Sequence, residues 1–343
     1  MRVGLYGRTN GFHKCIVLIF STSYEIDAFI GVRILEKELN LERYNMYLPY
    51  NERTPDTQYR DLLRLIIQSG REVRPIHGGT AKMVLGAQFH FNLKNGFPLL
   101  TERDLSKGFG GALGEHIAFL HGAQTIDELA TYGCPRVFWE RWVCDPKKSA
   151  GMGLPLGDLG PGSYGPAWTR FPTDDGRAYN QIREVVTLIK ERPYLRTFLI
   201  SPWIPYMIHN VSEWKRKVMV APCHGWIHVL VFPETRELSI HHFQRSADLP
   251  VGVAFNLVQY AACGLMLAQV TGYHMRELVH TFSDVHVYES QYTYVEELLK
   301  REPRRFPTVR LDSSVTDLFE FRKKHFTVEN YEPHPAMQIP TPV

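Results

Sequence analysis

The pattern of apolar and polar positions predicts both helices and strands along the chain. Apolar residues recur at helical spacing in Tyr24–Leu39, Asp56–Gly70 and Asn180–Lys190. Leu257–Gly272 is apolar nearly all round, which is typical of a buried helix. Short apolar runs predict strands at Cys15–Phe20 and Thr197–Ser201.

Two further strands form a predicted antiparallel pair. Trp226–Phe232 and Glu237–His242 are separated by Pro233–Arg236, which is short enough for a hairpin turn. Hairpins mixed with separate helices favour an α+β fold over a doubly wound parallel sheet.

A polar connection divides the chain into two predicted parts. Tyr47–Asp56 contains two prolines and few apolar residues. We expect residues 1–56 to be an N-terminal appendage of one strand and one helix, packed on the core, and residues 57–343 to be the main catalytic domain.

Composition narrows the class of protein. The 343 residues carry 39 Lys and Arg against 36 Asp and Glu, a net charge of +3. This balance argues against a nucleic-acid binder that works by bulk charge, but it permits a small positive pocket. No window has the ~20 apolar residues of a membrane span. Five cysteines without metal-ligand spacing, and a start that does not resemble a signal peptide, predict the cytoplasm (the host's, for a phage-encoded protein).

One cysteine has the surroundings of a nucleophile. Cys223 lies in Ala-Pro-Cys-His-Gly, immediately before a predicted strand. A buried structural cysteine is the simpler interpretation. A nucleophilic thiolate needs a nearby cation, and the predicted hairpin allows Arg245, in Gln-Arg-Ser-Ala-Asp, to supply it.

Polar residues in apolar surroundings supply further candidates. Asn256 enters the buried helix, where a helix N-cap is the simpler local interpretation. Asp284, His286 and Tyr288 alternate, so all three face one side of a strand. A zinc site at Asp284 and His286 has no further ligand at suitable spacing, and no metal is expected. The glycine-rich stretch Gly151–Gly165 favours turns over a phosphate-binding loop.

Taken together, these motifs resemble the folate-dependent thymidylate synthase family. The resemblance rests on Pro222–His224, Gln244–Asp248, Gly252–Asn256 and Asp284–Tyr288. Upstream motifs follow in the family's order, namely Phe97–Thr101, Glu115, Phe119–Leu120, Trp139, Trp142, Leu159–Pro161 and Tyr164–Gly165. The tail Tyr331–Val343 extends the match over residues 57–343.

The resemblance implies a fold and a reaction. The fold is a large mixed β-sheet flanked by helices, with one sheet face forming a homodimer interface. In the reaction, Cys223 adds to C6 of a pyrimidine nucleotide, and C5 then accepts a one-carbon unit from 5,10-methylenetetrahydrofolate. Glu115 and Tyr164 serve proton transfers, and Asp248 and Asn256 complete the predicted catalytic group.

Nucleotide binding follows from the same resemblance. Asn256 pairs with O4 and N3 of the base, which favours uracil because relatives that act on cytosine carry Asp there. The other implied nucleotide-binding residues are Arg74, Arg196, Gln244, Arg245, Ser246, His286 and Tyr288. In this family the partner subunit completes the phosphate site; here Arg196 matches one arginine of that pair, and Thr197 replaces the other. His286 and Tyr288 address a hydroxyl that ribose and deoxyribose share.

The implied folate-binding residues are Trp139, Asp248, Gly252, Thr341 and Val343. Arg103 falls near a basic family position and either serves the folate tail or is a surface charge. Thr341 stands where synthases have an apolar residue, and Val220 replaces a larger residue before the nucleophile. Both changes favour water near the transferred carbon, and therefore a 5-hydroxymethyl product.

These observations predict a dUMP 5-hydroxymethylase and leave three alternatives open. One is a divergent thymidylate synthase, which would form dTMP and dihydrofolate. Another is a cytidylate-type hydroxymethylase. The third is an inactive relative that binds nucleotide or RNA, against which the joint presence of Cys223, Glu115, Tyr164 and Asn256 argues.

Overall fold

The computed structural model describes residues 46–75, 79–211 and 213–341. The predicted strand at Cys15–Phe20 and helix at Tyr24–Leu39 lie outside these residues. Met46–Val343 forms one compact unit. The division at residue 56 stays a prediction, although Arg53 is buried against the main body and donates hydrogen bonds to Phe306 O (2.9 Å) and Thr308 Oγ1 (2.6 Å).

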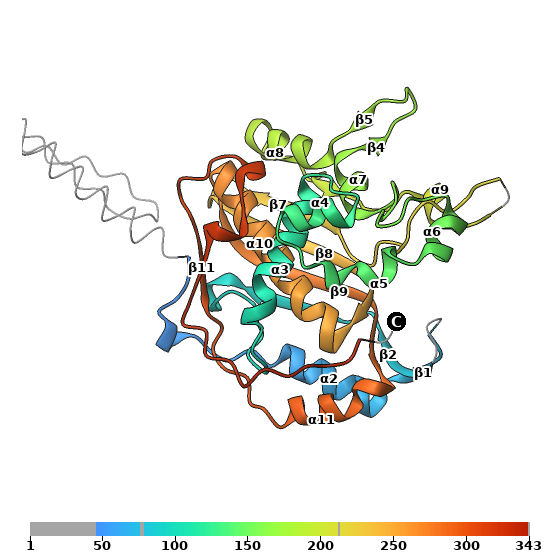
Figure 1. Ribbon diagram of the computed structural model, residues 1–343. Coiled ribbons are helices and arrows are strands. Elements are labelled where there is room, and N and C mark those ends of the chain that lie inside the picture. The colour runs from blue at the N-terminus through green and yellow to red at the C-terminus, as the bar shows by residue number, and fades with distance from the viewer. Residues whose placement is uncertain (1–45, 76–78, 212, 342–343) are drawn as a thin grey trace, which may run out of the picture. The chain divides into compact units, whose positions relative to one another are not determined.

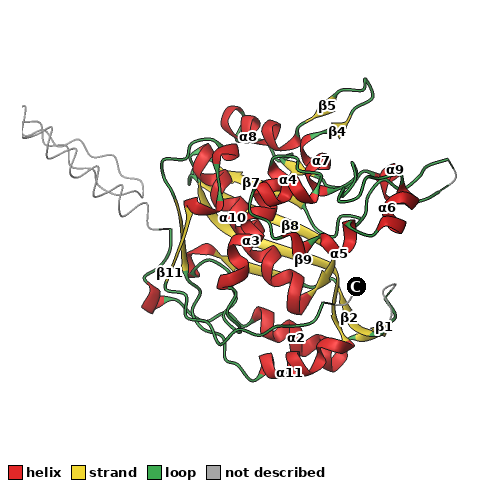
Figure 2. Ribbon diagram, in the orientation of Figure 1, coloured by secondary structure: helices red, strands yellow, loops and turns green. Residues whose placement is uncertain are grey.

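Within the described residues, seven strands form one mixed sheet (Figures 1 and 2). Their order is β1-β2-β9-β8-β7-β6, and β3 pairs with β9 beyond the end of β2. The strands are β1 (Arg71–Val73), β2 (Ala81–Leu85), β3 (Gln88–Asn92), β6 (Leu199–Ile200), β7 (Trp226–Phe232), β8 (Glu237–Asp248) and β9 (His274–Tyr288). β8 and β9 are parallel, and the other pairs are antiparallel.

Helices pack against this sheet. The longer ones are α2 (Gln58–Ser69), α3 (Ser106–Leu120), α8 (Gln181–Glu191), α10 (Ala254–Thr271) and α11 (Tyr292–Leu299). The shorter ones are α4 (Ile126–Thr131), α5 (Glu140–Val143), α6 (Pro146–Met152), α7 (Tyr164–Thr169) and α9 (Pro205–Ile208). Two small strand pairs lie outside the main sheet: β4 (Phe171–Pro172) with β5 (Ala178–Tyr179), and β10 (Thr308–Leu311) with β11 (Phe326–Glu329). Single turns of helix lie at 50–52, 93–95, 136–138, 249–253, 289–291, 318–320 and 323–325.

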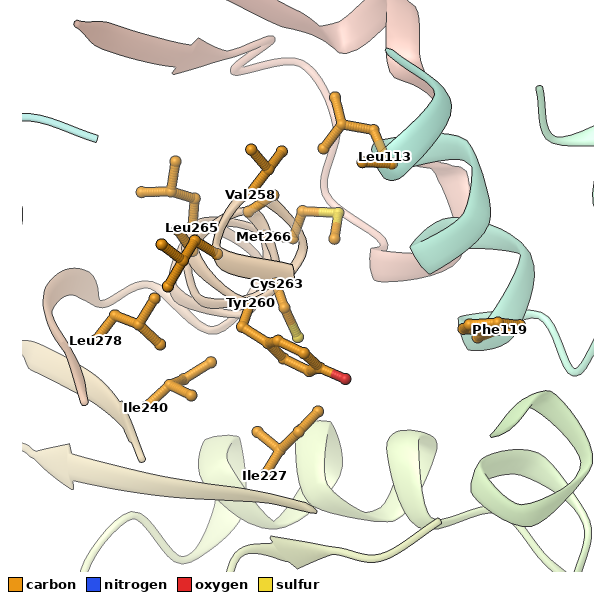
Figure 3. Close-up of a cluster of buried hydrophobic side chains, with 14 of the residues drawn as sticks. Leu113, Phe119, Ile227, Ile240, Val258, Tyr260, Cys263, Leu265, Met266 and Leu278 are labelled. Atoms are coloured by element: carbon orange, nitrogen blue, oxygen red, sulfur yellow. The ribbon is translucent and has the colours of Figure 1, made fainter. Parts of the chain in front are cut away.

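The helix α10 is the centre of the core. Figure 3 shows Tyr260 and Cys263 of α10 extending toward Ile227 and Ile240 of the sheet. Contrary to the expectation from the sequence, one segment, Leu249–Thr271, is long and apolar enough to cross a membrane, but 83% of its most apolar stretch is buried inside the fold. It is therefore a core helix. Gly272 ends it with φ +77°, a conformation that a side chain disfavours.

The predicted fold class is confirmed, and the element boundaries differ in detail. Asp56 accepts a hydrogen bond from the Gln58 backbone (3.0 Å), but the N-cap of α2 is Thr57. The strand predicted at Thr197–Ser201 is limited to Leu199–Ile200. β8 extends six residues beyond the predicted His242, which carries the Gln-Arg-Ser-Ala-Asp motif into the sheet.

Candidate active site

The segment that carries Cys223 enters the sheet just before β7. The backbone N–H of Cys223 donates to the Tyr164 hydroxyl (2.7 Å), and its carbonyl accepts from Arg245 N (2.8 Å) and Ser246 N (3.4 Å). Gly225 turns the chain with φ +103°, which favours glycine. The cysteine backbone is thus fixed by hydrogen bonds to α7 and β8.

The Arg245 side chain lies against the segment that carries Cys223, which agrees with the hairpin predicted from the sequence. Its Nε donates to Pro222 O (2.8 Å), and its Nη2 donates to Ala221 O (2.9 Å) and lies 3.5 Å from Cys223 Sγ. Burial raises the pKa of the Cys223 thiol, while Arg245 and the Tyr164 hydroxyl lower it. The structure therefore places a cation, Arg245, beside the Cys223 sulfur, where it opposes the effect of burial.

Replacing Arg245 with lysine is expected to slow alkylation of Cys223 by about tenfold to a hundredfold. Lysine keeps the charge but cannot reproduce the fork of hydrogen bonds to Ala221 and Pro222. The pH dependence of iodoacetamide labelling measures the effect, and the labelling midpoint should move to higher pH. Arg216→Lys is the matched control, since Arg216 binds the carbonyls of Val218 and Met219 instead. An unchanged midpoint in Arg245→Lys would remove Arg245 as the activating cation.

Tyr164 is held rigidly beside the cysteine. Its ring stacks on Phe119 (centroids 4.8 Å apart) and on His224 (4.5 Å apart). Burial raises the pKa of the Tyr164 hydroxyl well above its usual value. This residue therefore stays a phenol near neutral pH and can donate a hydrogen bond or relay a proton.

The Glu115 carboxylate lies between two donors. Trp139 Nε1 donates to its Oε1 (2.5 Å) and Gln259 Nε2 donates to its Oε2 (2.6 Å). Burial raises the pKa of Glu115, and these two hydrogen bonds oppose that shift. Such a carboxyl group is protonated more easily than one in water, which suits a group that transfers protons. The proposed folate residue Trp139 is also a direct partner of Glu115.

The helix N-cap interpretation of Asn256 is wrong. A π-helical turn, Leu249–Val253, continues directly into α10, so Asn256 lies inside a helix. Its side chain is buried, accepts from Gln244 Nε2 (3.0 Å) and donates to Gln259 Oε1 (2.9 Å). Gly252 lies beside it, because a Cβ built there would be 3.9 Å from Asn256 Oδ1 and 4.0 Å from Asp248 Cβ.

The three alternating polar residues of β9, Asp284, His286 and Tyr288, form a polar row beside these side chains. Asp284 accepts from the Ser246 hydroxyl (3.2 Å) and lies 2.8 Å from His286 Nδ1. His286 and Tyr288 rings make an edge contact at 4.8 Å. Burial raises the Tyr288 pKa to about 12. Among the described residues, no three His, Cys, Asp or Glu side chains are arranged to hold a metal ion.

Asp248 connects this row to the C-terminal tail. Gln291 Nε2 donates to both carboxylate oxygens of Asp248 (3.2 and 3.1 Å) and to Pro340 O (3.0 Å). Arg141 Nη1 donates to Thr341 O (3.1 Å). The tail therefore reaches the Asp248 side of the site, while Val343 lies outside the described residues.

Two predicted phosphate-binding arginines lie apart from the cluster. Arg74 is exposed after β1, and Arg196 is exposed before β6, at the opposite edge of the sheet. Five strand spacings separate these edges, on the order of 24 Å. One subunit does not bring both arginines together.

Sequence reasoning missed two supporting residues, the fully buried amides Gln259 and Gln291, and misjudged one alternative. Asp284 was expected in the polar row of β9, but no role was assigned to it beyond a possible zinc ligand. A glutamine within an apolar helix was the available signal for Gln259. The surface-charge interpretation of Arg103 is wrong, because Arg103 is buried and donates to Pro250 O (2.7 Å) and Met337 O (3.2 Å).

A comparison with protein families identifies the family of the chain. The family model described as thymidylate synthase matches residues 57–343. That match covers most of the chain and all of the clustered side chains described above. The chain belongs to the thymidylate synthase family.

Proposed function

We infer that the chain, as a member of this family, is a one-carbon transferase that acts at C5 of pyrimidine nucleotides. We propose that it converts dUMP, 5,10-methylenetetrahydrofolate and water into 5-hydroxymethyl-dUMP and tetrahydrofolate. The observation that carries the reaction class is the convergence of four side chains on one site. Tyr164 and Arg245 both contact Cys223, and Trp139 joins Tyr164 to Glu115.

The first step is addition of the Cys223 thiolate to C6 of the base. Uracil C5 is a weak nucleophile until C6 becomes tetrahedral, so covalent catalysis is required. Arg245 stabilises the thiolate before attack. The folate supplies the methylene group, and Glu115 and Tyr164 move protons at the base and at C5.

The choice of uracil rests on the Asn256 amide. This side chain retains one N–H and one carbonyl lone pair after its bonds to Gln259 and Gln244. One donor beside one acceptor complements O4 and N3–H of uracil. Ser246, His286 and Tyr288 are proposed to bind the phosphate and the sugar hydroxyl, and Trp139, Asp248 and Gly252 the folate.

The hydroxymethyl product rests on Thr341. Its carbonyl is held by Arg141, and the preceding carbonyl of Pro340 is held by Gln291, the partner of Asp248. Its hydroxyl makes no hydrogen bond within the described part of the chain and is half-buried, so it is available to bind water. A water held there supplies the oxygen of the hydroxymethyl group.

Substituting Thr341 with valine is expected to shift the products toward dTMP and dihydrofolate by about tenfold, since it removes one water-binding hydroxyl. Wild-type and variant enzyme are incubated with dUMP and methylenetetrahydrofolate, and nucleotide and folate are identified by mass. Thr341→Ser, which keeps the hydroxyl, is the control. Wild-type enzyme that forms dTMP and dihydrofolate would refute the hydroxymethylase and establish a synthase.

We also propose a cytoplasmic homodimer. Along β7, Trp226, His228 and Leu230 face away from the buried side and are partly exposed, and Phe243 of β8 lies opposite Trp226. An uncovered sheet face with large apolar residues suits a second copy of the chain. A dimer also explains why Arg74 and Arg196 lie at opposite edges: one of them can reach the partner's phosphate site.

A further inference from the structure

The new inference concerns Gln259, a residue of α10 to which the proposed function gives no role. Gln259 is fully buried and joins the Asn256 amide to the Glu115 carboxylate. We propose that Gln259 is a positioning residue that locks the Asn256 amide in one orientation and thereby sets the preference between uracil and cytosine. This inference rests on the proposed role of Asn256 in reading the base.

The direction of every hydrogen bond around Gln259 is fixed by its partners. Gln259 Nε2 faces Glu115 Oε2 (2.6 Å) and Ala112 O (3.3 Å). A backbone carbonyl only accepts, so the amide nitrogen of Gln259 must lie on this side. Its oxygen therefore faces Asn256, and Asn256 must present its Nδ2 to Gln259.

The opposite side of Asn256 gives the same orientation independently. Gln244 Nε2 donates to Ser246 O (3.1 Å), again a carbonyl that only accepts, and to Asn256 Oδ1 (3.0 Å). Gln244 Oε1 lies 2.9 Å from His280 Nε2. Both neighbours thus require Asn256 Oδ1 toward Gln244 and Nδ2 toward Gln259. A flipped Asn256 amide would place its nitrogen against Gln244 Nε2 and its oxygen against Gln259 Oε1.

This lock has a consequence for substrate choice. Uracil presents an acceptor at O4 and a donor at N3, whereas cytosine presents a donor at N4 and an acceptor at N3. The same amide can bind either base only if it turns over. Ala112 O and Ser246 O fix the orientations of Gln259 and Gln244, and these two amides prevent the rotation of Asn256. One base is therefore favoured, and the other base would place donor against donor and acceptor against acceptor.

Gln259 also connects base recognition to proton transfer. It is one of two donors to Glu115, so its removal leaves Trp139 as the remaining partner among the described side chains. Glu115 then loses a hydrogen bond that favours its charged form. The acidic limb of the activity profile should therefore move to higher pH when Gln259 cannot donate.

Gln259→Met tests both consequences, since methionine fills a similar volume with no hydrogen-bond donor and only a weak acceptor. The dissociation constants of dUMP and dCMP are measured by calorimetry, and activity is measured across pH. We expect the dUMP-to-dCMP preference to fall about tenfold to a hundredfold. Gln269→Met is the matched control, because Gln269 lies on the same helix and donates to the carbonyls of Asp312 and Val315.

A second variant covers the case in which Gln259→Met does not fold. Gln259→Glu keeps the shape and the acceptor toward Asn256 but faces Glu115 with an oxygen, so it should shift the acidic limb most. A melting temperature lowered with both preference and acidic limb unchanged would overturn the inference. Wild-type enzyme that prefers dCMP would refute the proposed substrate alone, because Gln259→Met would then reduce that preference instead.

Discussion

Acidification from pH 7 to pH 5 is expected to destabilise the protein strongly, because four buried histidines must stay neutral in the fold. Burial lowers the pKa of His116, His224 and His280 to about 3, and that of His242 well below its usual value. They gather around Tyr260, whose ring stacks on His242 (3.5 Å).

The stability falls with falling pH because the unfolded chain binds more protons than the folded one. In the unfolded chain these histidines bind protons below about pH 6.5, and in the fold only near pH 3. Their contribution to stability is complete above pH 6.5 and decreases as the pH falls below it, by about 2 kcal/mol per histidine at pH 5. The buried Glu102, whose pKa is raised to about 7, opposes part of this loss.

His116→Phe is expected to stabilise the protein and to flatten its acid response. Within the described residues neither ring nitrogen of His116 has a hydrogen-bond partner, and the ring lies between Trp168 and Tyr260. Phenylalanine suits these surroundings and removes about 1–3 kcal/mol of unsatisfied polarity. Urea unfolding between pH 5 and pH 8 measures the effect, with exposed His209→Gln as control. An acid response as steep as that of wild type would contradict this account.

Replacing Cys223 with serine is expected to reduce product formation by about 10⁴-fold or more, because serine is a much weaker nucleophile at this position. Binding of dUMP should change little, since its proposed contacts come from other side chains. Product is followed by chromatography and binding by calorimetry. Cys263→Ser is the control, because Cys263 is buried in α10 and burial alone raises the pKa of its thiol. Activity retained in Cys223→Ser would exclude covalent catalysis by this residue.

The sequence predicted the elements whose pattern is local. The apolar run of α10, the alternation of β9 and the hairpin of β7 and β8 all appear in the structure near their predicted positions. The hairpin also explains why Arg245 was correctly expected beside Cys223, since pairing of adjacent strands follows from a short turn.

What the sequence could not predict depends on contacts between distant segments. Gln259 meets Glu115 across 144 positions, and Gln291 meets Asp248 across 43. Neither glutamine belongs to a motif. The contact of Gln259 depends on the packing of α10 against α3, and that of Gln291 on the position of the C-terminal tail. Asn256 was mistaken for a cap because the π-helical turn before α10 has no clear sequence signal.

Release of tritium from [5-³H]dUMP tests the central claim most directly. Transfer of a carbon to C5 must expel the hydrogen there, and we propose that this step requires the covalent adduct with Cys223. We predict release that requires methylenetetrahydrofolate, matches the hydroxymethyl nucleotide formed, and is lost in Cys223→Ser. Absence of release from wild-type enzyme, or equal release from wild type and Cys223→Ser, would contradict it.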